Sequence, residues 1–340
     1  MKKTLLIIAA LALLTSCEKN QNETKPINVA ENLPKDITVI VNGTNEVKAP
    51  MYPWSEKYNF LGFGYDVTDK FQDEASVRAS VVNMSAYDTG NPYRVDIGTN
   101  TEGSWNIIEA ESAVDLSEKL SSSIEQTQGL KVFGNTIKDL FPNATVEDKK
   151  YVYGYYSNYW INKRYKFFYD QNVNNFLTAE FKCDALTLSA QALVAKYGTH
   201  VLNQIKIGST FDVFYQAEAP ELNRSNIVRE GFRYALLKTF GLMSGFLDDI
   251  NLKELNANKS VQIYYKSIGG DASKLKPQTI NNKVIVNISE WRSTTTMDKS
   301  RFIGTFGNGL TSLDKFIDNS AKRDEVKLYI QQYIASKAVK

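Results

Sequence analysis

The sequence predicts an α+β protein in which long strands and helical segments follow one another along the chain. Aromatic residues make up 12% of the 340 residues, with 19 Tyr and 17 Phe, and aromatic side chains favour strands. Residues 200–216 carry apolar side chains at every second position, which is the period of a strand. Residues 171–200 and 310–338 instead space apolar side chains three and four apart, which is the period of a helix. The alternating row of the strand consists of Val201, Ile205, Ile207, Phe211, Val213 and Tyr215.

The first residues, MKKTLLIIAALALLTSC, predict a secretion signal over residues 1–16. Two lysines precede an apolar run, residues 4–14, that is shorter than the roughly 20 residues of a spanning helix. The end of the signal, LTSC, resembles the lipobox of bacterial lipoproteins. This resemblance implies cleavage before Cys17 and attachment of lipid, palmitate included. The alternative is an ordinary signal peptide followed by a chance cysteine.

The charge balance gives little support to nucleic-acid binding. The chain has 40 basic and 38 acidic residues, and loss of the two leader lysines makes these counts equal. No basic stripe interrupts this balance, so no long-range field for nucleic acid is expected. Once Cys17 carries lipid, Cys183 is the one cysteine left, so the fold must rely on its core instead of a disulfide. We expect Cys183 to be a buried small apolar residue.

The first half of the chain predicts a tether, several strands and one polar insert. Residues 17–35 are polar and contain two prolines, which predicts a flexible tether. The segment FLGFGYDV at 60–67 contains glycines that indicate a bend or a close backbone approach. Further predictions are a first strand at 36–41, an extended segment at 104–116, a polar, weakly helical segment at 117–143 and an aromatic strand at 151–169.

The second half predicts two helical segments and a second polar insert. In the helix at 171–200, Thr187 fits the N-cap of its second part, and Gly198 fits the helix stop. The order strand, polar helical insert, strand occurs twice in the chain. Further predictions are a helical insert at 219–259, a strand at 260–268 that ends in a glycine pair, and a closing amphipathic helix at 310–338.

The helix-to-strand junction at Tyr197 resembles the membrane-attack-complex/perforin (MACPF) family. That family's motif is an aromatic residue, Gly, Thr or Ser, His, an apolar residue and a later glycine. The matching positions are Tyr197, Gly198, Thr199, His200, Val201 and Gly208. The family often has two glycines at the last place, where this chain has Gly208-Ser209. Gly269-Gly270 and Trp291 match later family positions, and the resemblance covers residues 36–338.

The resemblance implies the MACPF/cholesterol-dependent-cytolysin fold, a bent, twisted four-stranded antiparallel sheet flanked by two helical clusters. The core strands then fall near 104–116, 151–169, 200–218 and 260–268, and the clusters at 117–150 and 219–259. In pore-forming members each cluster unfurls into a β-hairpin, and many copies complete a barrel. The resemblance covers the chain to its end, so no separate C-terminal domain is expected.

The second insert fits a membrane-inserting hairpin better than the first. Phe232, Tyr234, Leu236, Phe240 and Leu242 would share one strand face, although Lys238 interrupts the row. A spacing of four satisfies both a helix and a strand, so an ordinary amphipathic helix remains an equal interpretation of this pattern. The first insert is rich in Ser and Gln, as in SSS at 121–123, and offers little surface for lipid.

The lone histidine, His200, predicts a structural corner instead of chemistry. No nucleophile or acid lies at a recognised spacing from it, and no second His or cysteine cluster is present to complete a metal site. We expect its ring to bond backbone groups left over at the helix end. We likewise interpret Asp248-Asp249 as a solvated helix end and not as a calcium site. No enzyme activity, cofactor or metal is expected.

These observations favour a lipoprotein that oligomerises and perforates a target membrane. The resemblance is to antimicrobial toxins of gut Gram-negative anaerobes, which implies an outer-membrane anchor, surface exposure or release in vesicles, and action on competing bacteria. The expected partners are a target membrane, further copies of the chain, and a surface receptor contacted by loops at 84–103. The alternative is a non-lytic adhesion or binding module on the same fold, and an envelope enzyme is a third reading with no catalytic set to support it.

Overall fold

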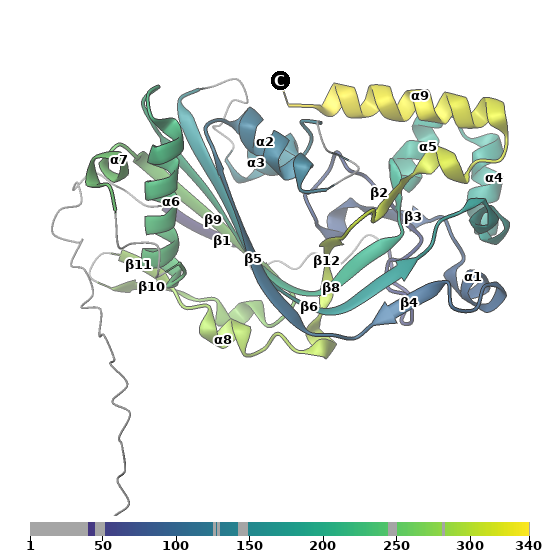
Figure 1. Cartoon of the computed structure of the whole chain (residues 1–340), viewed down its shortest axis with the longest axis horizontal. Coiled ribbons are helices and arrows are strands. Elements are labelled where there is room, and N and C mark those ends of the chain that lie inside the picture. Colours follow the sequence, from purple (N-terminus) through teal and green to yellow (C-terminus); the bar gives the residue numbers. More distant parts are fainter. Residues whose placement is uncertain are drawn as a thin grey trace, which may run out of the picture. The chain divides into compact units, whose positions relative to one another are not determined.

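A bent antiparallel sheet forms the centre of the protein (Figure 1). The computed structural model describes residues 40–44, 52–124, 127, 130–141, 149–243, 250–280 and 283–339, all within one unit, Lys35–Lys340. The four core strands are adjacent in the order β5 (Glu102–Ala110), β6 (Tyr151–Phe167), β8 (Gln204–Glu218) and β9 (Lys259–Ile268). The structure therefore confirms the α+β class and the antiparallel core sheet.

Three further short strands bring this sheet to seven strands. They are β1 (Ile40–Thr44), parallel to β9; β4 (Val95–Gly98), beside the end of β6; and β12 (Arg301–Thr305), beside the start of β8. Of the first strand predicted at 36–41, residues 36–39 lie outside the described residues.

The two long strands change neighbours at the same level of the sheet, and the sheet bends there (Figure 1). On β6, pairing passes from β5 to β4, and the register to β8 shifts between Ile161 and Lys163. On β8, pairing passes from β12 to β9 between Gly208 and Thr210. An extra residue in one strand increases the local bend.

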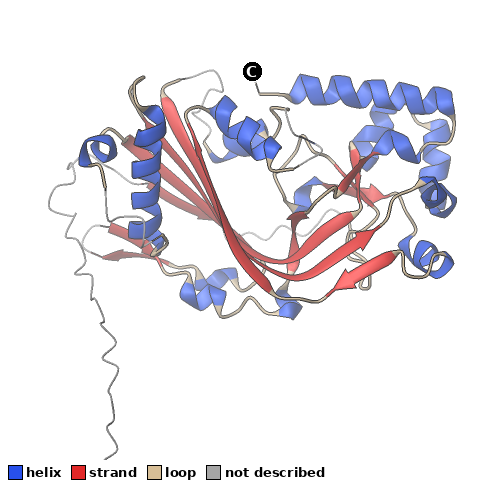
Figure 2. Ribbon diagram, in the orientation of Figure 1, coloured by secondary structure: helices blue, strands red, loops and turns tan. Residues whose placement is uncertain are grey.

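Helices cover both faces of one end of the core sheet, and a second group of helices lies at the right of the view, beyond its other end (Figure 2). A second sheet has the order β13 (Leu310–Ser312), β7 (His200–Leu202), β2 (Phe63–Tyr65), β3 (Val77–Ser80), and β10 (Pro277–Ile280) pairs with β11 (Lys283–Val286). The helices are α1 (Met84–Gly90), α2 (Ala113–Ser122), α3 (Gly134–Leu140), α4 (Ala179–Thr187), α5 (Ala190–Tyr197), α6 (Arg224–Phe240), α7 (Leu252–Asn256), α8 (Ser289–Arg292) and α9 (Ser320–Lys337). No helix among the described residues has the length and apolar character needed to cross a membrane.

Both long predicted helices are shorter than expected. The segment 171–200 divides into a 3-10 turn, α4 and α5, and Thr187 ends α4 instead of capping its successor. Ser189 is the cap, because its hydroxyl accepts the Ala192 amide at 3.2 Å. The closing helix starts at 320, where the Asn319 side chain caps it, and residues 310–312 form β13 instead.

Three further predictions were wrong in detail. The extended segment 104–116 ends as a strand at Ala110, because Ser112 caps α2 by accepting the Asp115 amide at 3.1 Å. The region 84–103 contains α1 and β4, so it is not simply a loop. Cys183 is exposed on α4, because the buried face of that helix is supplied by Phe181 and Ala185.

Candidate functional site

The two helical clusters lie on opposite faces of the same end of the core sheet (Figure 1). Strand side chains alternate between faces, so the parity of each residue identifies its face. Tyr153 and Tyr155 of β6 pack with the first cluster, α2 and α3, whereas Val152 and Tyr156 pack with α6. Residues 111–150 and 219–258, which contain these clusters, connect β5 to β6 and β8 to β9.

Phe232 is the apolar anchor of α6. Its side chain is fully buried, and its ring centre lies 5.2 Å from that of Tyr215 on β8. Gly154 of β6 lies directly beneath the ring. A Cβ added at Gly154 would come within 2.4 Å of the Phe232 ring, well inside van der Waals contact. The absence of a side chain at Gly154 therefore leaves the space that the Phe232 ring occupies, and we call this contact the seat of Phe232.

Arg224, at the first turn of α6, joins the starting points of both clusters. Its side chain is only 8% exposed. The guanidinium donates to the carbonyl of Glu111, where the first cluster leaves β5, at 2.7 and 2.9 Å. It also donates to the carbonyls of Tyr151 at 2.6 Å and Ala219 at 3.1 Å. One side chain thus bonds the chain at the ends of β5 and β8 and at the start of β6.

Two further polar contacts hold α6 to its surroundings. The Arg233 guanidinium lies 3.0 Å from the Glu109 carboxylate of β5. Buried Asn258 donates to the Ile227 carbonyl of α6 at 2.9 Å and accepts from the Tyr215 hydroxyl at 2.8 Å. Burial raises the pKa of Tyr215 far above its ordinary value, so this hydroxyl remains a donor.

The first cluster is held partly by serine hydroxyls. Ser117 and Ser121 of α2 are fully buried. The Ser117 hydroxyl donates to the Val132 carbonyl, and the Ser121 hydroxyl accepts from the Val132 amide at 3.2 Å. These bonds add to an apolar contact with the sheet that the sequence did not suggest, since the first cluster also buries Leu116, Leu120, Phe133 and Ile137 in the core.

The predicted glycine positions Gly208, Gly269 and Gly270 lie together at the bend, whereas Gly198 lies elsewhere, at the end of α5. A Cβ at Gly208 would overlap the Trp160 carbonyl oxygen at 1.8 Å, so the strands approach here more closely than a side chain permits. Gly269 has a φ of +71°, and the buried Trp291 indole donates to its carbonyl at 3.0 Å. The ring centres of Trp160 and Trp291 lie 5.7 Å apart. The backbone thus turns around a tryptophan pair at the point where β9 ends.

The histidine motif forms the corner between α5 and the small sheet. Gly198 ends α5 with a φ of +75°, and the Tyr197 hydroxyl donates to Asp184 at 2.8 Å. The His200 ring lies 2.9 Å from the Thr199 hydroxyl, so it bonds a side chain and not a helix-end carbonyl as expected. Burial lowers the pKa of His200 to about 4, and Lys315 adds to this effect, so the ring is neutral at pH 7.

The predicted insertion residues occupy different environments. Phe232, Leu236 and Phe240 are buried against the sheet, whereas Tyr234 and Leu242 are half-buried. Asp248-Asp249 and the lipidation candidate Cys17 lie outside the described residues. Within the described part of the chain, no group of three or more His, Cys, Asp or Glu residues could hold a metal.

Sequence reasoning missed Gly154 and Arg224, which hold the clusters. The sequence offered a signal for Gly154, since a glycine inside a strand indicates that another part of the chain approaches the backbone closely. Arg224 carried none, because an arginine at the start of a polar helix looks like a solvated residue.

No known family model matches this sequence, and no curated protein matches it. Solved structures do match its fold. A protein with a MAC/perforin domain from Bacteroides thetaiotaomicron superposes with a TM-score of 0.66 at 17% identity, over 86% of this chain and 64% of that one. GNIP1Aa from Chromobacterium piscinae superposes with a TM-score of 0.61 at 14% identity, over 82% of this chain and 56% of that one. The chain therefore has the MACPF fold, and it spans about three fifths of the length of these structures.

Proposed function

From the MACPF fold as premise, we propose that this chain perforates a membrane as a ring of copies. Residues 111–150 and 219–258 refold into two β-hairpins that continue the core strands into a shared barrel. The observation that carries this proposal is that both segments contain forty residues and leave the sheet at the same end. Two hairpins of equal length, side by side, would reach equally far from the sheet.

The segment lengths suit a membrane crossing. A spanning β-strand needs about 9–11 residues, so a hairpin needs about 20 residues and a turn. Forty residues provide about twice this length, which leaves chain to bridge the space between the sheet and the bilayer. The row Phe232, Leu236, Phe240 is buried in the folded protein, so its apolar surface would be exposed only on release of α6.

The lipid anchor and the target belong to the same proposal. Lipid on Cys17 would hold the chain at the outer membrane of a Gram-negative producer, from which it could be released in vesicles. The target would be a competing bacterium, recognised through a surface receptor. The segment 84–103, with α1 and β4, is the surface that we propose for the receptor. Killing of related strains by purified vesicles, lost when Cys17 is replaced, tests this part separately.

A matched pair of substitutions on α6 tests the refolding. Tyr234 and Leu237 are both half-buried in the folded protein, so a charge at either has a similar effect on folding. In a barrel strand they would lie on opposite faces, with Tyr234 toward lipid. A charge on the lipid face costs up to about 2–4 kcal/mol at mid-membrane and less for Asp. Tyr234→Asp should therefore abolish dye release from liposomes, and Leu237→Asp should preserve it. Equal loss in both variants would contradict the strand geometry.

The alternative is a non-lytic surface binding module. It is favoured by the first cluster, in which the hydroxyls of Ser117 and Ser121 are buried and bonded to Val132, so that release of this cluster would break internal hydrogen bonds. Electron microscopy of the protein on target membranes separates the two functions. Rings with dye release support the pore, whereas bound single copies without release support the binding module.

A further inference from the structure

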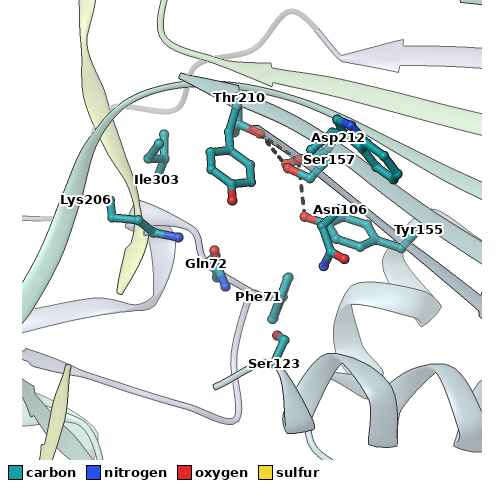
Figure 3. Close-up of a pocket in the computed structure, with 12 residues that line it drawn as sticks. Phe71, Gln72, Asn106, Ser123, Tyr155, Ser157, Lys206, Thr210, Asp212 and Ile303 are labelled. Atoms are coloured by element: carbon teal, nitrogen blue, oxygen red, sulfur yellow. Dashed lines mark hydrogen bonds between the residues drawn. The ribbon is translucent and has the colours of Figure 1, made fainter. Parts of the chain in front are cut away.

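A polar pocket opens on the sheet face that carries the first cluster (Figure 3). Its volume is about 290 Å³. At about 30 Å³ per water this is room for about ten waters, or for one monosaccharide. The floor is formed by side chains of β6 and β8, and the rim by Phe71, Gln72, Asn106, Ser123 and Ile303. This volume is at the lower end of the range for small-molecule sites, and the mainly polar lining suits a polar ligand.

One end of the pocket is positive. The Lys206 side chain points into the cavity from β8 (Figure 3), and its ammonium lies 5.2 Å from the centre of the Tyr159 ring. In the described part of the chain no carboxylate lies within 4.0 Å of this ammonium. Burial and the nearby Arg164 lower the pKa of Lys206 to about 8, so it is still charged at pH 7. A partly dehydrated ammonium favours an anion beside it.

The other end of the pocket presents a carboxylate and a row of hydroxyls. The Asp212 carboxylate accepts from the Thr210 hydroxyl at 2.8 Å and from the Tyr155 hydroxyl at 3.2 Å. The Ser157 hydroxyl continues the row at 2.9 Å from that of Thr210. The second oxygen of Asp212 lies 4.0 Å from the Lys266 ammonium. A ligand amine here would meet the positive charge of Lys266, so a neutral hydroxyl is the better donor.

We propose that this pocket binds a small hydroxylated anion of the carboxylated-monosaccharide class. Its carboxylate bonds Lys206, and its hydroxyls bond the row formed by Ser157, Thr210 and Asp212. The rings of Phe71, Tyr155 and Tyr159 provide the flat apolar contacts that sugar rings pack against. Among the lining residues, only Ser123 belongs to the segments that we propose to refold, so ligand binding is tested on the folded protein in solution, whether or not the chain perforates membranes.

Calorimetric titration of the full chain with four small probes tests the proposal. Glucuronate should bind, while glucose, which lacks the carboxylate, and inorganic phosphate, which lacks the ring, should each bind at least about tenfold more weakly. Methyl glucuronide distinguishes the end of a glycan chain from a free sugar, and binding of either form supports the site. Equal binding of glucose, or tighter binding of phosphate, would overturn the assignment.

Two pocket variants and one control test whether glucuronate binds in this pocket. Lys206→Met should weaken glucuronate binding about ten- to a hundredfold, because a charge-assisted bond is lost. The control Lys253→Met changes an exposed lysine on α7 and should leave binding unchanged. Asn106→Trp fills the pocket from an exposed strand position, so it should block binding even if Lys206→Met folds poorly. Glucuronate binding that survives both pocket variants would place the ligand elsewhere.

Discussion

The seat of Phe232 on Gly154 gives the sharpest test of how α6 is held. In Gly154→Ala the new methyl would lie 2.4, 2.6 and 2.7 Å from three ring atoms of Phe232. Carbon atoms prefer about 3.5–4.0 Å, so the ring must retreat by about 1 Å. Overpacking of this kind costs about 1–3 kcal/mol in unfolding free energy. Because Phe232 lies on α6, most of the strain should act on the attachment of that helix.

The assay combines urea unfolding with hydrogen exchange and dye release. Gly154→Ala should lower the unfolding free energy by about 1–3 kcal/mol and speed exchange along α6. If α6 release precedes membrane insertion, dye release from liposomes should become faster. Gly98→Ala is the matched control, because Gly98 also lies in a strand of this sheet and an added Cβ there meets nothing within 4 Å. This control should change stability by less than about 0.5 kcal/mol.

A second substitution tests the cause. Phe232→Ala removes all three ring atoms that the new methyl would strike, so the double variant should lose less stability than the two single variants summed. A coupling of about 1–2 kcal/mol is expected for residues in direct contact. Additive losses would refute the claim that Gly154 and Phe232 form one seat.

Three further changes have defined outcomes. Arg224→Met should lower the unfolding free energy by about 2–4 kcal/mol, because buried carbonyls lose their donors. Hydrogen exchange should accelerate in both clusters. Acceleration in α6 alone would contradict the conclusion that Arg224 stabilises both. The pKa of His200 is about 4 in the native state and about 6.5 when unfolded, so stability should fall between pH 6.5 and 4 by up to about 3 kcal/mol. Urea titrations should show that His200→Gln lacks this part of the pH slope, and an unchanged slope would disprove the assignment. Cys17→Ser should abolish palmitate labelling and shift the protein from the membrane fraction to the soluble one.

Much of the sheet could be predicted because its pattern is local. The aromatic run at 151–169 lies in the long strand β6, and the alternating apolar row from Ile205 to Tyr215 lies in β8. The single strand predicted at 200–216 was wrong at its start, because the chain changes sheets at Asn203 and Val201 lies in β7 of the second sheet. Gly198 ends its helix with a positive φ, as a glycine at this place predicts. Helix boundaries were less predictable, because nearby caps compete: Ser189 and Thr187 are both good N-caps, and only the structure shows which one is used.

The contacts that hold the clusters could not be predicted, since they join distant parts of the chain. Arg224 bonds carbonyls of Glu111 and Tyr151, which only the topology brings together. Lys206 lies between two buried isoleucines, and in a one-sided sheet it would face water. Here both faces of β8 are covered, so its ammonium points into a pocket.

Lipid exposure of α6, measured residue by residue on membranes, tests the central claim most directly. Single cysteines at positions 232–242, in a background with Cys17→Ser and Cys183→Ser, would carry a fluorophore that lipid-attached quenchers reach only within the bilayer. Refolding to a barrel strand predicts quenching at alternate positions, including Phe232, Tyr234 and Leu236, with the positions between them open to water. Quenching every third or fourth position, or no quenching at all, would show that α6 remains a helix and would contradict the pore.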